Sequence, residues 1–155
     1  MVRARFYPEA DRRTQWFGDG NATMPRIDKL VLHTTESAGG WPGYRGGAIT
    51  PTFTYEPWQH RWRQHLPVNG SARALLDPGS TEVRENRDHA VQLEISCYCD
   101  PEHAGSAHFV TDLDDRAFDD HSRFVAWLHR EWRLPLRLAP RWLAYPASAG
   151  AARRG

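Results

Sequence analysis

The sequence predicts a single α/β domain, and three patterns lead to that prediction. Residues 29–33 and 90–98 are apolar segments of strand length, and residues 114–133 repeat apolar side chains every three or four positions, as an amphipathic helix does. The chain has 155 residues, of which 40% are hydrophobic, so it is long enough to bury one core. We therefore expect strands and loops followed by one long helix.

The first strand lies in KLVLHTTES, residues 29–37, and carries a histidine near its end. The strand stops close to His33, because the next four residues are polar and two glycines follow. Side chains alternate along a strand, so His33 shares a face with Val31. A histidine between a strand and a polar loop is well placed as a metal ligand or catalytic base, and an ordinary hydrogen-bonded histidine is the competing interpretation.

Two further extended segments follow the Gly-rich stretch SAGGWPGYRGGAIT. PTFTYEP, residues 51–57, contains residue types that favour strands. HRWRQHLPV, residues 60–68, alternates polar residues with Trp62 and Leu66, which favours an amphipathic strand or hairpin. Its arginines and aromatic residues could instead stack on nucleic-acid bases, but the net charge of +1 argues against nucleic acid as a partner.

The next strand, AVQLEISCY at residues 90–98, has a clear two-residue period. Val91, Leu93 and Ile95 point to one face, so Glu94 projects from the other face of a central strand. A helix is predicted from Asp114 to about Arg133. Asp114 or Asp115 can cap its start, and Pro135 stops it. Its apolar face is expected to contain Phe118, His121, Val125, Leu128 and Trp132.

Cysteine content and termini indicate the cellular compartment. Cys97 and Cys99 are too close for an ordinary structural disulfide and suit a reducing compartment. With His103 they lack the second half of a zinc knuckle, so we expect small, partly buried thiols at a strand end. The N-terminus lacks the apolar run of a secretory signal, and no segment approaches the roughly 18 apolar residues of a membrane span. We therefore expect synthesis in the cytoplasm and no membrane partner.

Several segments, in their order along the chain, resemble one enzyme family. They are VLHTTE, WRQHLPVNGSARAL, ENRDHAVQLEI, CDP, WLHREW and WLAYPAS. Together they are similar to the zinc-dependent N-acetylmuramoyl-L-alanine amidases (amidase type 2, peptidoglycan recognition protein-like), as in actinobacterial phage endolysins. The resemblance implies a mixed central β-sheet flanked by helices. It divides the chain into an N-terminal extension (1–27), an amidase-like domain (28–148) that is incomplete at its C-terminal end, and a flexible tail (149–155).

The resemblance also implies an activity and two site residues. Such enzymes hydrolyse the amide bond between N-acetylmuramic acid and L-alanine in bacterial cell-wall peptidoglycan. His33 corresponds to the first Zn²⁺ ligand, and Glu94 to the strand glutamate beside the zinc-bound water, whose proton it can accept. The family's other two ligands, a histidine and then an aspartate or cysteine, follow the helix. Here no histidine follows His129, so the expected Zn²⁺ site is incomplete.

Three interpretations therefore stay open. The chain is a peptidoglycan amidase with an incomplete or differently completed zinc site, a non-catalytic muropeptide-binding module, or an interaction module built on residues 58–65. We expect peptidoglycan as the partner, a monomer, and action on the bacterial cell wall if the protein is released. Candidate replacement ligands, with His89 as the first choice, are His60, His65, His89, His103 and His108.

Overall fold

The computed structural model describes residues 3–18, 22–74 and 89–138, which contain a mixed five-stranded sheet in the order β1-β4-β3-β5-β2. The predicted α/β class is confirmed at this level. The main elements are β1 (Ala10–Asp11), β2 (Lys29–Thr34), β3 (Phe53–Glu56), β4 (Arg61–Gln64), β5 (Ala90–Ile95) and the helix α2 (Asp115–Trp132).

The sheet combines one hairpin with three parallel pairings. β3 and β4 run antiparallel and are joined by a short 3-10 turn, η2 (Pro57–Gln59), after which His60 adopts a left-handed backbone with φ 50°. β5 is parallel to β2 on one side and to β3 on the other, and β1 is parallel to β4. The two strands expected to carry His33 and Glu94 are therefore direct neighbours.

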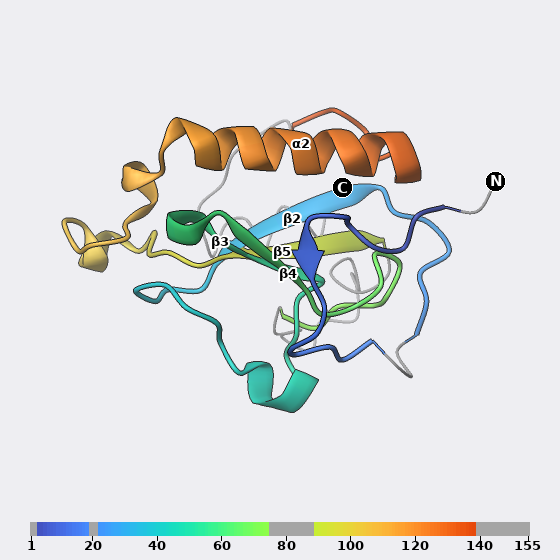
Figure 1. The fold of residues 1–155 in the computed structure, drawn as a ribbon, viewed down its shortest axis with the longest axis horizontal. Coiled ribbons are helices and arrows are strands. Elements are labelled where there is room, and N and C mark those ends of the chain that lie inside the picture. The colour runs from blue at the N-terminus through green and yellow to red at the C-terminus, as the bar shows by residue number, and fades with distance from the viewer. Residues whose placement is uncertain (1–2, 19–21, 75–88, 139–155) are drawn as a thin grey trace, which may run out of the picture.

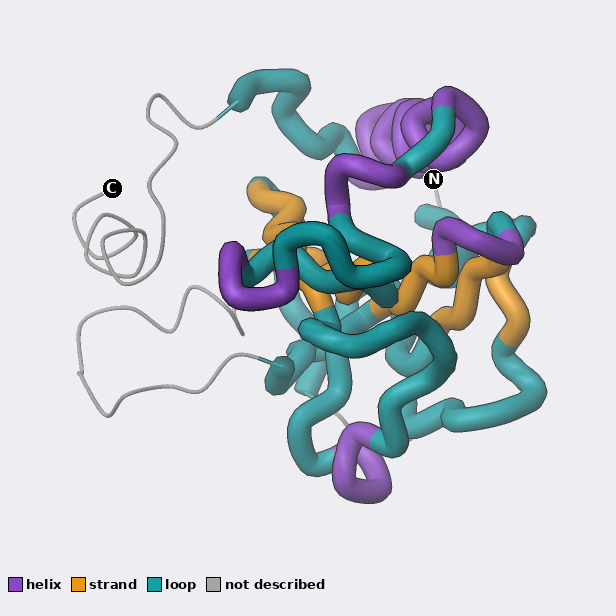
Figure 2. Tube along the Cα trace, turned by 90° about the vertical axis from the view of Figure 1, so that its left-hand side faces the viewer, coloured by secondary structure: helices purple, strands orange, loops and turns teal. Residues whose placement is uncertain are grey.

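Helix α2 covers one face of the sheet, and a loop covers the other (Figures 1 and 2). That loop includes the short 3-10 turn η1 (Tyr44–Gly47), which lies on the side of the sheet opposite α2 (Figure 1). Thus, within the described ranges, α2 is the single α-helix that flanks the sheet. The loop face is the one that contains the candidate site.

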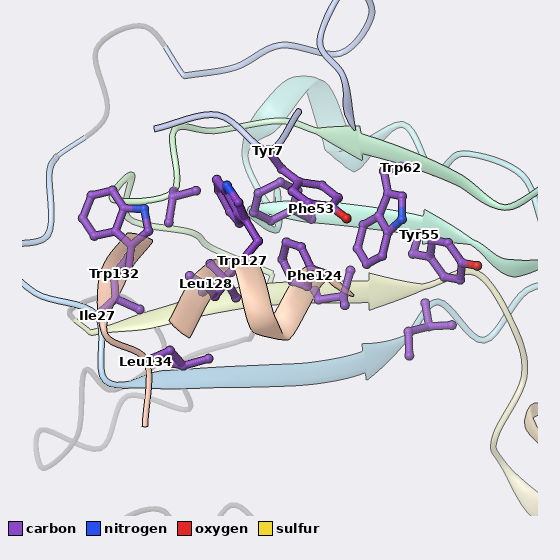
Figure 3. Packing of buried hydrophobic residues seen from close by; sticks show 14 of the residues in the cluster. Tyr7, Ile27, Phe53, Tyr55, Trp62, Phe124, Trp127, Leu128, Trp132 and Leu134 are labelled. Atoms are coloured by element: carbon purple, nitrogen blue, oxygen red, sulfur yellow. The ribbon is translucent and has the colours of Figure 1, made fainter. Parts of the chain in front are cut away.

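The core fills the space between α2 and the sheet (Figure 3). Side chains of α2 pack against every second residue of the strands, because successive strand residues point to opposite faces of the sheet. Aromatic rings dominate the contact, with Trp62 stacked on Phe124 at 4.6 Å between ring centroids. The large side chains labelled in Figure 3 are Tyr7, Ile27, Phe53, Tyr55, Trp62, Phe124, Trp127, Leu128, Trp132 and Leu134.

The helix has the expected limits, and its buried face contains Leu128 and Trp132 as predicted but is shifted at its N-terminal half. Asp114 caps its start by accepting a hydrogen bond of 2.8 Å from the Ala117 backbone N–H, and Arg133 ends it in a left-handed conformation. Trp132 is buried, as expected. The prediction that Phe118 faces the core is wrong, because its side chain is 59% exposed and Phe124 occupies the buried face instead.

The segment expected to be an N-terminal extension, residues 1–27, contributes to the same core. Tyr7, Met24 and Ile27 are buried among the core residues, and β1 pairs with β4. The described part of this segment is thus a part of the sheet and its core. The expected tail, residues 149–155, and the end of the expected amidase-like domain lie outside the described residues.

Among the described residues, none of the helices combines the length and the apolar character needed to cross a membrane.

Candidate active site

A row of polar residues crosses the sheet on the face opposite α2. The strand register places Arg63 beside Thr54, Thr54 beside Glu94, and Glu94 beside His33. Residues paired in register lie on the same face of a sheet. His33 and Glu94 therefore share one face of the sheet, whereas their catalytic and metal-binding roles stay predictions.

An open pocket of about 390 Å³ lies between the ends of the strands and the Gly-rich loop. Among the described residues that line it, Glu94 is the acidic one and Arg45, from η1, the basic one. His33 neighbours the pocket through Thr34 without lining it. The lining residues are Thr34, Thr35, Pro42, Gly43, Tyr44, Arg45, Ile49, Ala74 and Glu94.

The pocket raises the proton affinity of Glu94. Burial, and secondarily the nearby charge of Glu36, raises the pKa of its carboxyl group to about 7. Burial disfavours the ionised form because the carboxylate loses its hydration, and a second negative charge adds to that effect. Near neutral pH the Glu94 carboxyl group is therefore present in both forms, and a pKa near the working pH suits a group that takes and returns a proton during a reaction.

His33, the register neighbour of Glu94, has an unused ring nitrogen. Burial lowers its pKa, so the imidazole is neutral near pH 7. Its Nε2 is buried and has no hydrogen-bond partner in the described structure. A neutral imidazole nitrogen of this kind can bind a ligand group or a metal ion, whereas a merely structural histidine usually has both nitrogens satisfied.

Glu36 ties the loop after β2 to the loop after β5. Its carboxylate accepts hydrogen bonds from the backbone N–H groups of Cys99, at 3.1 Å, and Asp100, at 3.0 Å, and from the Thr34 hydroxyl. Partial burial opposes its ionisation, but these hydrogen bonds prevail and lower the pKa of Glu36. The resulting anion supplies the charge that acts on Glu94. Sequence reasoning assigned Glu36 no role, although its position directly after the strand was visible.

His65 lies on the same face as Glu94, but both of its ring nitrogens already have partners. Nε2 is 2.8 Å from the Thr54 hydroxyl oxygen, and Nδ1 is 2.9 Å from the Gln15 carbonyl oxygen. Burial lowers its pKa to about 4, so the ring is neutral. His65 is thus a hydrogen-bonded core histidine and a poor replacement for a missing zinc ligand.

The other histidines are distributed around the molecule. His89, the first choice from the sequence, precedes Glu94 by five residues, or about 16 Å of extended strand, so it lies far from His33. His60 lies on the α2 side, with Nδ1 3.3 Å from Asp120. His108 stacks on Trp58. His103 packs against the Tyr98 ring.

These positions test whether the described residues fit a zinc ion. His33 offers one suitable nitrogen, but no group of three histidine, cysteine, aspartate or glutamate side chains in the described part of the chain could hold a metal. A protein zinc site needs at least three such ligands. The described residues therefore do not by themselves form the site that the family resemblance implies.

Searches against protein-family models, curated proteins and solved structures gave no match.

Proposed function

We propose that the protein is a peptidoglycan amidase of the endolysin type, which hydrolyses the amide bond between N-acetylmuramic acid and L-alanine. The observation that carries this proposal is the position of Glu94, whose pKa of about 7 makes it a proton carrier in a pocket. It stands beside His33, whose Nε2 is unpartnered. The sequence resemblance supplies the identity of the substrate.

In this reaction Glu94 moves one proton. As a carboxylate it accepts a proton from water while the water oxygen forms a bond to the lactyl carbonyl carbon. When the carbon–nitrogen bond breaks, the same carboxyl group returns the proton to the nitrogen of L-alanine. The products are the lactyl carboxylic acid and a peptide with a free amino terminus, and Glu94 ends in its starting state.

The pocket would hold the amide and its two flanking groups. A volume of about 390 Å³ falls within the range of small-molecule sites and suits a fragment of a muropeptide. The pocket is open on one side, as a long polymeric substrate requires. Since the described residues do not complete a zinc site, no step of this scheme is assigned to a metal.

The test of this proposal is hydrolysis of purified peptidoglycan, followed as newly freed L-alanine amino groups. Glu94→Gln keeps the size of the side chain and removes its ability to carry a proton, so the rate should fall about 10²- to 10⁴-fold. Glu102→Gln, at an exposed glutamate, is the matched control and should react as the native chain does. Equal rates for native protein and Glu94→Gln would refute the proposed role.

A second candidate function is a muropeptide-binding module without turnover. The incomplete set of metal ligands in the described residues favours it. In that case the native chain should sediment with insoluble peptidoglycan but release no amino groups above a heat-treated control. Glu94→Gln would then still bind peptidoglycan, because a module without turnover does not depend on proton transfer by Glu94.

A further inference from the structure

A chain of hydrogen bonds connects the N-terminal segment to the pocket wall. The Gln15 carbonyl oxygen is 2.9 Å from His65 Nδ1, His65 Nε2 is 2.8 Å from Thr54 Oγ1, and Thr54 Oγ1 is 2.6 Å from the Tyr44 hydroxyl oxygen. Thr54 and His65 are fully buried, and Tyr44 lines the pocket. Because Thr54 is the register neighbour of Glu94, this chain ends beside the candidate catalytic carboxyl group.

Donor and acceptor counting fixes the direction of every hydrogen bond in this chain. A carbonyl oxygen can only accept, so His65 must carry its proton on Nδ1 and donate to Gln15. A neutral ring then has a lone pair on Nε2, so the Thr54 hydroxyl must donate to it. Thr54 has only one hydroxyl proton, so the Tyr44 hydroxyl must donate to Thr54. The Tyr44 oxygen keeps only lone pairs for any other partner.

We infer that His65 is a positioning residue, whose hydrogen bond to Thr54 holds the Tyr44 hydroxyl oxygen as an acceptor in the pocket wall beside Glu94. That wall then binds a ligand through a hydrogen-bond donor, such as an amide N–H or a sugar hydroxyl, and disfavours a group that can only accept. This inference deepens the proposed function, on which the identity of the ligand as a muropeptide rests. The direction of these hydrogen bonds rests on the contacts and on the neutral state of the buried His65 ring.

The hydrogen bonds through Thr54 also hold the backbone turn at Tyr44 in place. Tyr44 and Arg45 have φ values of 48° and 49°, a left-handed conformation that is unfavourable for residues other than glycine. Both residues line the pocket. The hydroxyl group of Tyr44 attaches this turn to the sheet through Thr54, so loss of that anchor should also loosen the pocket wall.

The first test reads the proton on His65 directly and needs no ligand. In a ¹⁵N-labelled native chain at neutral pH, long-range proton–nitrogen spectra should show His65 protonated on Nδ1, with Nε2 as the nitrogen that accepts a hydrogen bond. In Thr54→Val the Nε2 resonance should move to that of a nitrogen without a donor, and in the matched Thr54→Ser it should stay in place. Protonation of Nε2 in the native chain, or no shift in Thr54→Val, would overturn the inference.

The second test measures binding of muramyl dipeptide, a soluble fragment with the lactyl amide, by chemical-shift titration. Tyr44→Phe should weaken binding about 3- to 10-fold, the effect of one ordinary hydrogen bond. Thr54→Val should weaken it similarly, and the double variant should bind as Tyr44→Phe does, because both changes remove one acceptor. Circular dichroism of each variant verifies folding. Binding by Thr54→Val as tight as that of the native chain would overturn the inference.

The two tests separate this inference from the proposed function. If the native protein binds no muramyl dipeptide and releases no amino groups, the proposed function fails. The ring nitrogen spectra of His65 still decide the direction of the hydrogen bonds. If the native chain cleaves peptidoglycan but His65 carries its proton on Nε2, the proposed function stands and the positioning role of His65 is refuted.

Discussion

The two faces of the sheet bury comparable side chains in different ways. Toward α2, the strands present rings and aliphatic groups, and burial of that apolar surface is itself stabilising at about 25 cal/mol per Å² (Figure 3). On the opposite face, Thr52, Thr54, His65 and Gln92 are also fully buried. A buried polar group of this kind adds little net stability and is costly when its hydrogen bonds are missing.

The polar face depends on hydrogen bonds between its own residues. On the polar face, Thr54 and His65 are satisfied by each other and by Tyr44 and Gln15. His33 Nε2 departs from this rule because it is buried without a partner, and Glu94, the register neighbour of His33, has a raised pKa. Such unmatched groups reduce stability, and they are the ones available to a ligand.

The largest expected effect concerns the apolar face. Trp132→Ala should lower the free energy of unfolding by about 3 to 5 kcal/mol, the usual range for deleting a large buried aromatic side chain. Trp132 is 6% exposed, and its Nε1 donates a hydrogen bond of 2.7 Å to the Ala4 carbonyl oxygen. Urea denaturation of both chains measures the difference.

Phe118→Ala is the matched control on the same helix. Its side chain is 59% exposed, so its truncation should change the free energy of unfolding by about 0.5 kcal/mol or less. Equal losses for Trp132→Ala and Phe118→Ala would mean that α2 packs with another face toward the sheet.

The second largest expected effect is a pH dependence of the free energy of unfolding, which comes from Glu94 on the polar face. The pKa of Glu94 is raised from 4.5 to about 7, so between these values the folded chain binds more protons than the unfolded chain. Stability due to this group therefore falls as pH rises through this window, by at most about 3 kcal/mol. Glu94→Gln should thus be more stable than the native chain at pH 8 and equally stable at pH 4.

The pH dependence due to Glu94 must be measured as the difference in free energy of unfolding between the native protein and Glu94→Gln. The reason is that His65 changes stability with pH in the opposite direction. Its pKa is lowered from 6.5 to about 4, so its contribution to stability is lost as pH falls through that window. The two effects partly cancel in the native chain. Urea denaturation of both proteins at pH 4, 6 and 8 isolates the contribution of Glu94, and a constant difference across these values would contradict the raised pKa.

The smallest expected effect is on metal content. If His33 is the one residue that matches a ligand of the resembled family, the native chain should retain well under one zinc per molecule after dialysis, because several ligands are needed for tight binding. His33→Ala should remove the residual zinc, and His103→Ala should not. Elemental analysis measures both. One tightly held zinc per native chain would contradict this expectation and show that another histidine or cysteine completes the site, with His89 as the first candidate from the sequence.

Much of the fold follows from local sequence patterns. The strands at β2 and β5 were predictable because their apolar residues have strand length and strand period. The limits of α2 were predictable from the Asp114 cap and from Pro135, since these act through the backbone nearby. The pairing of β2 with β5 lies beyond such patterns, because it joins segments about 60 residues apart.

The buried face of α2 was mispredicted for a physical reason. Asp120 lies on that face and is 3% exposed. It accepts a hydrogen bond of 2.5 Å from the Tyr55 hydroxyl and is paired with Arg123. A periodicity search treats an aspartate as a surface residue, so it favoured the stripe that contains Phe118. Arg123 belongs to the same helix, but Tyr55 comes from β3, and that partner cannot be seen in the helix sequence.

The candidate site shows the same limit. His33 and Glu94 were found through their strands and the family resemblance. The hydrogen-bond chain through His65 was missed, because Gln15, Tyr44, Thr54 and His65 come from four separate segments. Each residue alone has ordinary surroundings in the sequence, and only the register of β3 with β5 places the chain beside Glu94.

The strand order also has a consequence for how the chain folds during its synthesis. The β3–β4 hairpin can form within microseconds of leaving the ribosome, because its strands are adjacent in sequence. β5, which lies between β3 and β2, and then α2 are synthesised later. Until they emerge, the apolar face with Phe53 and Tyr55 is uncovered. The nascent chain therefore passes through a stage in which it can aggregate or bind a chaperone, and final closure of the sheet must be slow compared with hairpin formation.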